Sequence, residues 1–356
     1  MAGSRLTETR PRRVSSSRRS AVNVSARASR AAGGASRVEV SDIQRSRLIA
    51  ATVAAVEESG YAQATVGKIT ARARVSRRTF YELFDDRDEC LAAVLEEAVE
   101  LVRAELTAAE LGPLAWRERV RVGLAAILGF FDREPALARV CVVHALRAGP
   151  VVLARREEVI AQLTAALDEG RLQGARGETC TPLTAEGLVG AGCAIVYARL
   201  ERREREPLSG LLGELMGMIA LAYLGPAAAR RERALSAPPR PAVTGELPAA
   251  ESRAASDPLS GVSMRLTYRT ARVLEAIATL GGGGEHPSNR EVATYAEVAD
   301  PGQISKLLRR LERLGLLANL GAGHARGGPN AWTLTPAGEH VAQSMRMYNP
   351  HQREVA

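Results

Sequence analysis

The chain has 356 residues, which is long for one domain and predicts two or three. Its hydrophobic share of 46% and charged share of 25% are those of a globular protein, so a wholly disordered chain is excluded. Aromatic residues make up only 4%, and Val, Ile and Thr show no repeated alternation, which disfavours an all-β sandwich. The abundance of Ala, Leu, Arg and Glu predicts a mainly α fold.

The first 40 residues carry most of the formal net charge of +8, because nine arginines stand there against two glutamates. This segment has almost no large apolar side chains, so burial cannot offset the entropy of ordering it. We predict a disordered basic tail over residues 1–40. Three interpretations of it stay open: a loose DNA-binding arm, a functionless or misassigned start, and an organelle transit peptide.

Cysteine usage and hydropathy predict a soluble protein of a reducing compartment, the cytoplasm. The four cysteines occur singly, without a CxxC pair or a Cys/His ligand spacing, so we expect no disulfide, no metal and no cofactor. No apolar run reaches the roughly 20 residues that span a bilayer, and no signal-peptide pattern is present. A membrane partner is therefore not expected.

From Ser41 onward the pattern is helical, and residues 65–84 predict two short helices joined by a tight turn. Thr65 can cap the first helix and Ser76 the second. In the second helix Phe80 and Phe84 lie four residues apart and face inward. The other side of that helix is left with Arg77, Arg78 and Tyr81. A short helix with a packed back and a basic, hydrogen-bonding front is what the DNA major groove admits.

The order of residues in this segment resembles the N-terminal DNA-binding domain of TetR-family repressors, over roughly residues 45–94. The matching positions are Gly60-Tyr61, Thr65-Val66, Ile69, Ala73, Val75-Ser76, Thr79-Phe80-Tyr81, Phe84 and Asp86-Arg87. Two positions depart from the family pattern. Arg74 stands where the family usually has glycine, and Leu83 replaces a frequent histidine that would touch the DNA backbone.

The resemblance implies a DNA contact for each residue of one set: Thr65, Ser76, Arg77, Arg78, Thr79, Tyr81 and Arg87. Thr65 and Tyr81 would touch phosphate, whereas the residues from Arg77 to Thr79 would face base edges or nearby backbone. Arg87 takes the place of a lysine that anchors the next helix to the DNA backbone. The alternative is that Tyr81 and Arg87 are ordinary surface residues. We place this DNA-binding domain at residues 41–91.

Residues 92–225 predict an all-helical domain of about six helices, several of them opened by prolines. The resemblance implies that this domain encloses an effector pocket and dimerises through its last two long helices, here near 184–203 and 208–224. Glycines on both helices permit close approach, and ordinary packing within the chain is the alternative. A pocket would be lined by Trp116, Phe130, Phe131, Cys141 and His144. For His144 the alternative is an ordinary core histidine.

Residues 226–263 contain six prolines without apolar periodicity, so we predict a disordered linker there. Beyond it, residues 264–346 predict three helices and then two strands around a turn, followed by a tail over 347–356. The third of these helices has a strong start at Asp300-Pro301. Helix–turn–helix plus a β-wing is a winged helix, and this stretch resembles MarR-type winged-helix modules.

By analogy with those modules, four side chains would enter the major groove: Gln303, Ser305, Lys306 and Arg309. Arg310 would lie near the backbone, and His324 and Arg326 at the wing tip would reach the minor groove. The alternative is that this module serves dimerisation and that its charges form a solvated face.

Together these features favour a sequence-specific transcriptional regulator, a repressor, located at the nucleoid. It would bind double-stranded DNA as a homodimer and respond to an unidentified small-molecule effector. The alternative is a ligand-independent architectural protein that binds DNA through both modules. An enzyme is disfavoured, because no nucleophile elbow, phosphate-binding loop or paired catalytic carboxylates are found.

Overall fold

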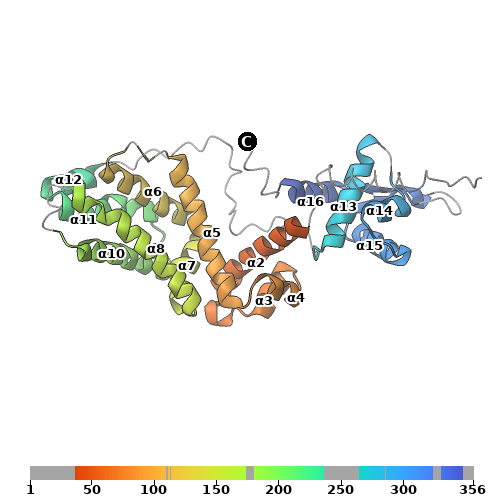
Figure 1. Cartoon of the computed structure of the whole chain (residues 1–356), viewed down its shortest axis with the longest axis horizontal. Helices are drawn as coiled ribbons and strands as arrows, with labels where there is room; N and C mark the ends of the chain where they lie inside the picture. The colour runs from red at the N-terminus through yellow and green to blue at the C-terminus, as the bar shows by residue number, and fades with distance from the viewer. Residues whose placement is uncertain are drawn as a thin grey trace, which may run out of the picture. The chain divides into compact units, whose positions relative to one another are not determined.

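The computed structural model describes residues 37–109, 111–112, 114–173, 180–235, 264–284, 286–323 and 330–347. These described residues fall into two compact units, one within the range 41–266 and the other made of those from 267 onward together with 37–40. Helices dominate both, which confirms the mainly α prediction (Figure 1). Most of the predicted tail and linker, and the two predicted wing-tip residues His324 and Arg326, lie outside the described residues.

The predicted DNA-binding domain is built from four helices. They are α2 (Arg37–Ser59), α3 (Val66–Ala73), α4 (Arg77–Leu83) and α5 (Arg87–Ala108), with the short 3-10 helix η1 (Tyr61–Gln63) after α2. The helix α2 ends before Gly60, whose φ of 76° suits glycine. It begins at Arg37, so the predicted tail boundary at residue 40 is wrong. Val40 and Ile43, three residues apart on one helix face, are both buried.

The helical domain follows, and prolines open several of its helices, as predicted. Its helices are α6 (Trp116–Arg133), α7 (Pro135–Val142), η2 (His144–Arg147), α8 (Pro150–Asp168), α9 (Gly170–Gln173), α10 (Pro182–Glu201), η4 (Leu208–Leu211), α11 (Leu212–Tyr223) and α12 (Pro226–Ala234). Its core is continuous with that of the DNA-binding domain, because Phe80 and Leu91 lie in one buried cluster with Phe130 and Leu137. The two predicted domains are therefore one packed body.

The helix α12 contradicts the predicted start of the linker. Pro226 at its first position opens the helix, which packs along α11 and buries Ala228 and Ala229. Glu232 is almost fully buried and accepts from Arg121 Nη1 of α6 at 2.8 Å. The composition of the whole segment 226–263 hides this helix, because the other five prolines of the segment lie beyond residue 237.

The C-terminal unit contains α13 (Tyr268–Leu280), η5 (Gly281–Gly283), α14 (Asn289–Tyr295), α15 (Pro301–Arg313), β1 (Leu317–Asn319), η6 (Leu320–Gly323), β2 (Trp332–Leu334) and α16 (Pro336–Met347). The strands β1 and β2 pair antiparallel, with Leu317 opposite Leu334 and Asn319 opposite Trp332. Both strands lie where alternation predicted them. Leu274, Ile304 and Leu308 are among the buried residues of this unit.

Among the described helices, α10 alone is by itself long and apolar enough to cross a membrane. The bent pair 135–147 and 150–173 passes the same test only if it is taken as one span. Core and interface helices of soluble proteins also pass this test. Only 17% of the apolar window of α10 is buried, and most of its other residues are half-buried or exposed.

Replacing Glu232 by Ala is expected to lower the free energy of unfolding by about 3–5 kcal/mol, because Arg121 would stay in the interior without its carboxylate. Urea unfolding measures this change. Arg230→Ala, at an exposed position of the same helix, is the control and should change stability by less than about 0.5 kcal/mol. Equal effects of the two variants would contradict the role of the ion pair.

Candidate nucleic-acid interface

The helix α3 is fixed at both ends by local hydrogen bonds. The Thr65 hydroxyl accepts from the backbone N–H of Lys68 at 3.3 Å, which confirms the predicted N-cap. At the other end Arg74 has φ 53° and ψ 37°, the left-handed conformation that glycine adopts at this place in many helix ends. The N–H of Val75 then donates to the Thr70 carbonyl at 3.1 Å. The turn keeps its usual shape although an arginine occupies the glycine position.

The helix α4 is held from behind by two phenylalanines, as predicted. Phe80 is fully buried and Phe84 nearly so, and their ring centroids lie 5.7 Å apart. The Arg45 guanidinium lies 5.0 Å from the centroid of the Phe84 ring. Leu83 is half-buried and packs on the same core. It therefore does not supply the contact with the DNA backbone that a histidine makes in the family pattern.

The opposite side of α4 is exposed and carries Arg77, Arg78 and Tyr81. Tyr81 is 57% exposed, and its ring meets the edge of Phe80. Arg78 Nε donates to Glu82 Oε1 at 2.8 Å, and this hydrogen bond raises the pKa of Arg78. Arg77 forms no ion pair with any described residue. Of the two arginines, it is the one not already neutralised on its own helix.

The hydroxyl groups of the predicted interface are partly used within the chain. Ser76 Oγ accepts from the Thr79 backbone N–H at 3.0 Å and lies 2.8 Å from Thr79 Oγ1. Thr79 is half-buried. Ser76 and Thr79 therefore cap the start of α4. Their hydroxyl groups can contact DNA only with the donors and acceptors that these hydrogen bonds leave free.

Arg87 lies apart from this exposed side and is bound inside the domain. Its Nη1 donates to the Tyr61 carbonyl at 3.1 Å, and its guanidinium carbon lies 4.0 Å from the centroid of the Tyr61 ring. Tyr61 in turn donates from its hydroxyl to Asp88. Arg87 thus has a structural role, in addition to any phosphate contact. Sequence reasoning missed it, because Tyr61 and Arg87 are brought together only by the fold.

The structure also adds cations that the motif did not single out. Lys68, Arg72 and Arg74 are exposed on α3 and its turn. Arg72 pairs with Glu58 of α2. The regular placement of basic residues in the run KITARAR was the available signal.

The five predicted pocket residues do not all come together, because Trp116 lies in a different cluster from Phe130, Phe131 and Cys141. Trp116 lies in a cluster with Leu167, Ala185 and Tyr223, and its Nε1 donates to the Ala166 carbonyl at 3.0 Å. A Cβ at Gly170 would lie 2.2 Å from the Trp116 ring, so this ring is tightly packed.

Phe130, Phe131 and Cys141 belong to the core shared with α5, and burial raises the pKa of the Cys141 thiol to about 12. His144 lies at the edge of that core in η2, where burial lowers its pKa, and its Nδ1 has no described hydrogen-bond partner. The described part of the chain contains no cluster of three His, Cys, Asp or Glu residues able to hold a metal ion.

The predicted residues of the C-terminal unit lie on α15, which has a turn before it like that before α4. Glu297 has φ 55°, and the Val298 N–H donates to the Ala293 carbonyl at 2.9 Å, as Val75 does to Thr70. Lys306, Arg309 and Arg310 are exposed. Gln303 is also exposed, and its Oε1 accepts from Arg269 at 3.0 Å.

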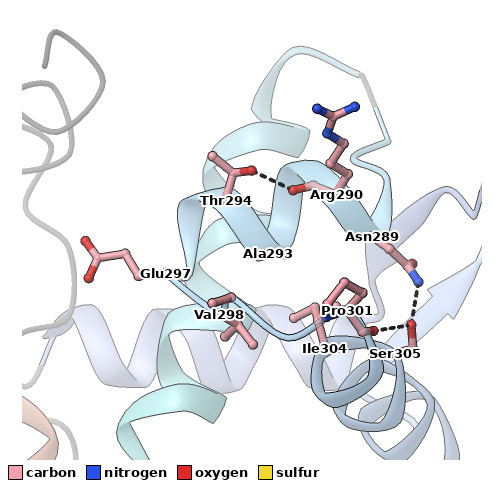
Figure 2. Close-up of a pocket in the computed structure, with 10 residues that line it drawn as sticks. Asn289, Arg290, Ala293, Thr294, Glu297, Val298, Pro301, Ile304 and Ser305 are labelled. Carbon is pink, nitrogen blue, oxygen red and sulfur yellow. Dashed lines mark hydrogen bonds between the residues drawn. The ribbon is translucent and has the colours of Figure 1, made fainter. Parts of the chain in front are cut away.

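Ser305 is turned toward α14, across a groove of about 720 Å³ (Figure 2). Its hydroxyl donates to the Pro301 carbonyl at 2.9 Å and accepts from Asn289 Nδ2 at 3.2 Å. Asn289 Oδ1 also accepts from Trp332 Nε1 of β2 at 2.6 Å. Ser305 is therefore engaged within the unit, and Asn289, which no sequence motif identified, links α14, α15 and the sheet.

Residues 48–94 match the family model described as bacterial regulatory proteins, tetR family. The chain carries a TetR-family N-terminal domain. Residues 48–94 thus have the domain type of bacterial regulatory proteins, and the prediction that the chain is not an enzyme agrees with this match. The match does not extend to the C-terminal unit, whose predicted MarR-like character stays a prediction.

Several solved structures are similar to about half of the chain. FadR from Bacillus halodurans is 19% identical, with a TM-score of 0.45 over 49% of this chain and 94% of that one. FadR from Bacillus subtilis, in complex with stearoyl-CoA, is 18% identical, with a TM-score of 0.44 over 50% and 97%. A TetR-like regulator from Rhodococcus sp. RHA1 is 23% identical, with a TM-score of 0.39 over 49% and 93%. No curated protein matches.

Replacing Arg74 by Gly is expected to raise the free energy of unfolding by about 1 kcal/mol, because a Cβ is unfavourable in the left-handed conformation. Arg74→Ala is the matched control, since it removes the guanidinium but keeps the Cβ. Chemical unfolding of both variants measures the difference. If Ala stabilises the protein as much as Gly, backbone strain at this turn is not the cause.

Proposed function

We propose that the protein is a sequence-specific repressor that inserts α4 into the major groove of double-stranded DNA. The observation that carries this proposal is the exposed side of α4, where Arg77, Arg78 and Tyr81 lie over the buried Phe80 and Phe84. Arginine can bond two acceptors of guanine at once, and Tyr81 can donate to phosphate. A helix that contacts base edges needs one side fixed by packing and the other side exposed and polar, and α4 has both.

The proposed assembly is a homodimer formed through α10. The exposed side of this helix is mostly apolar, with Leu183 70% exposed and Ala194 also exposed, and with the charged Glu186 between them. At Gly187 and Gly190 a Cβ would meet no described atom within 4 Å, so a second helix can approach there. An exposed apolar face of this kind marks an interaction site. A second copy buries it symmetrically and places two α4 helices on one duplex.

The glycines of α11 have a different explanation. A Cβ at Gly217 would lie 2.8 Å from the Arg233 side chain, and one at Gly213 would lie 3.3 Å from the Arg233 carbonyl. Both therefore permit α12 to approach α11 within one chain. This is ordinary intrachain packing, so the support for the dimer comes from α10 and not from the predicted small residues of α11.

Control by a small-molecule effector bound in the helical domain is part of the proposal. Its support is the shared core, because a change in the packing of α6 or α7 acts directly on residues that also hold α4. The effector itself is not identified by the residues that were predicted to line its pocket.

For the C-terminal unit we propose a second DNA contact through a winged-helix arrangement. The support is the turn before α15, which repeats the hydrogen bond and positive φ of the turn before α4, together with the exposed cations of α15. The competing proposal is that this unit binds protein. In that case the charged face of α15 would be an ordinary solvated surface. An architectural protein would use both units without sequence preference.

Arg77→Ala is expected to relax base preference at one position of each half-site, since a good bidentate contact is worth about 1–3 kcal/mol of discrimination. Selection of bound sequences from random DNA, followed by gel shifts at fixed salt, measures this. Arg103→Ala on α5 removes the same charge away from α4 and should leave the selected motif unchanged. An unaltered motif for Arg77→Ala would reject base reading by this residue. A wild-type protein that selects no motif would support the architectural alternative.

The double substitution Lys306→Ala/Arg310→Ala is expected to shorten the footprint of the full-length protein and to reduce the salt dependence of binding by about one to two phosphate contacts. Both residues are exposed one turn apart on α15. The double substitution of Arg230 and Arg231 to Ala on α12 removes an equal charge and serves as the control. If footprint and salt slope match those of the control, the C-terminal unit does not bind DNA through α15.

A further inference from the structure

One carboxylate of the DNA-binding domain receives arginines from two elements of the helical domain. Glu57 lies in the last turn of α2, and only 17% of its side chain is exposed. Arg139 of α7 donates from Nε to both oxygens of Glu57, each at 2.9 Å. Arg203, two residues beyond the end of α10, has its Nη2 3.0 Å from Glu57 Oε1. Glu57 therefore joins α2 to α7 and to the end of α10 at one point.

The two contacts differ in kind. The Arg139 contact is bidentate and largely shielded from solvent, which makes it strong and directional. The Arg203 side chain is 62% exposed, so its ion pair adds little to stability. Yet Arg203 has φ 52°, a conformation that is unfavourable for a residue with a Cβ. This conformation ends α10 as the one at Arg74 ends α3, because the Glu204 N–H donates to the Arg199 carbonyl at 3.2 Å.

A second ion pair lies beside this joint. Arg147 of η2 has its Nη2 3.3 Å from Oε1 of Glu201, at the end of α10. The helix η2 also contacts η1 of the DNA-binding domain. The end of α10 is thus tied to the DNA-binding domain by Glu57 directly and by η2 indirectly.

We propose that Glu57 is a positioning residue that sets the half-site spacing accepted by the dimer. This inference rests on the proposed function, in which α10 pairs with α10 of a second copy. When each DNA-binding domain is tied to the α10 helix of its own chain, the dimer holds its two α4 helices at one separation. Half-sites on DNA lie about one helical turn, roughly 34–36 Å, apart or at multiples of this distance. Without the tie, each α4 still reads its half-site, but only the shared apolar core fixes the separation, which is then held less tightly.

The test uses the full-length protein and DNA with two copies of the half-site selected by wild type, separated by spacers of stepwise different length. Glu57→Gln keeps the shape of the side chain but removes its charge. We expect unchanged affinity for a single half-site, and a loss of about two- to thirtyfold in discrimination between the best spacer and the others, as for other residues that couple two sites. Arg203→Gly should reduce this discrimination in the same direction and to a smaller extent, while relieving the positive φ.

The matched control is Glu58→Gln, because the neighbouring Glu58 pairs with Arg72 inside the DNA-binding domain. It should keep the wild-type spacing profile. A folded Glu57→Gln protein with the wild-type profile would overturn the inference and leave the proposed function intact. If Glu57→Gln does not fold, Arg203→Gly decides by the same criterion. Wild-type protein that binds all spacers equally also overturns the inference, whereas wild type that selects no half-site contradicts the proposed function itself.

Discussion

The packing of Phe80 and Phe84 behind α4 is the interaction on which the other features of the molecule depend. A helix of seven residues is not stable in water by itself, because nucleation costs more than so few hydrogen bonds return. Its position must therefore come from tertiary contacts. The two phenylalanines supply them on one side only, and this leaves the arginine side free of packing.

That packing does not end within the DNA-binding domain. The cluster that holds Phe80 continues through Leu91 and Val94 of α5 to Leu137 and Val152 of the helical domain. Close-packed cores transmit small displacements, because their side chains have few alternative arrangements. The orientation of α4 is consequently set by the helical domain as well as by its own motif, and Glu57 adds a polar constraint to this apolar one. In the proposed dimer, a change in the helical domain would therefore move α4 as part of a body, without a separate hinge.

Features with local causes could be predicted from the sequence, whereas those that depend on distant residues could not. The caps at Thr65 and Ser76 involve neighbours within three residues, and both are observed. The exposed side of α4 follows from helical periodicity in the same way. By contrast, the Arg87 contact with Tyr61 and the Glu57 contact with Arg139 join residues 26 and 82 positions apart.

The helix α12 is an instructive intermediate case. Its alanines and arginines favour a helix locally, but the prolines that follow dominate the composition of the longer segment. The packing of Ala228 and Ala229 and the burial of Glu232 against Arg121 show that these nine residues belong to the folded domain. The predicted pocket meets the same limit, because aromatic residues indicate a core without showing whether a ligand or another side chain fills the space beside them.

The distribution of charge favours base reading over nonspecific attraction. The nine arginines and two glutamates of residues 1–40 account for nearly all of the net +8, so the rest of the chain is almost neutral. Near the interface, Arg78 and Arg72 are already paired with glutamates. A protein that bound DNA mainly by charge would place unpaired cations over a broad surface, since each neutralised phosphate adds to affinity. Here two of the exposed cations are paired, and Arg77 stands unpaired among the described residues at the start of α4, where a recognition helix contacts base edges.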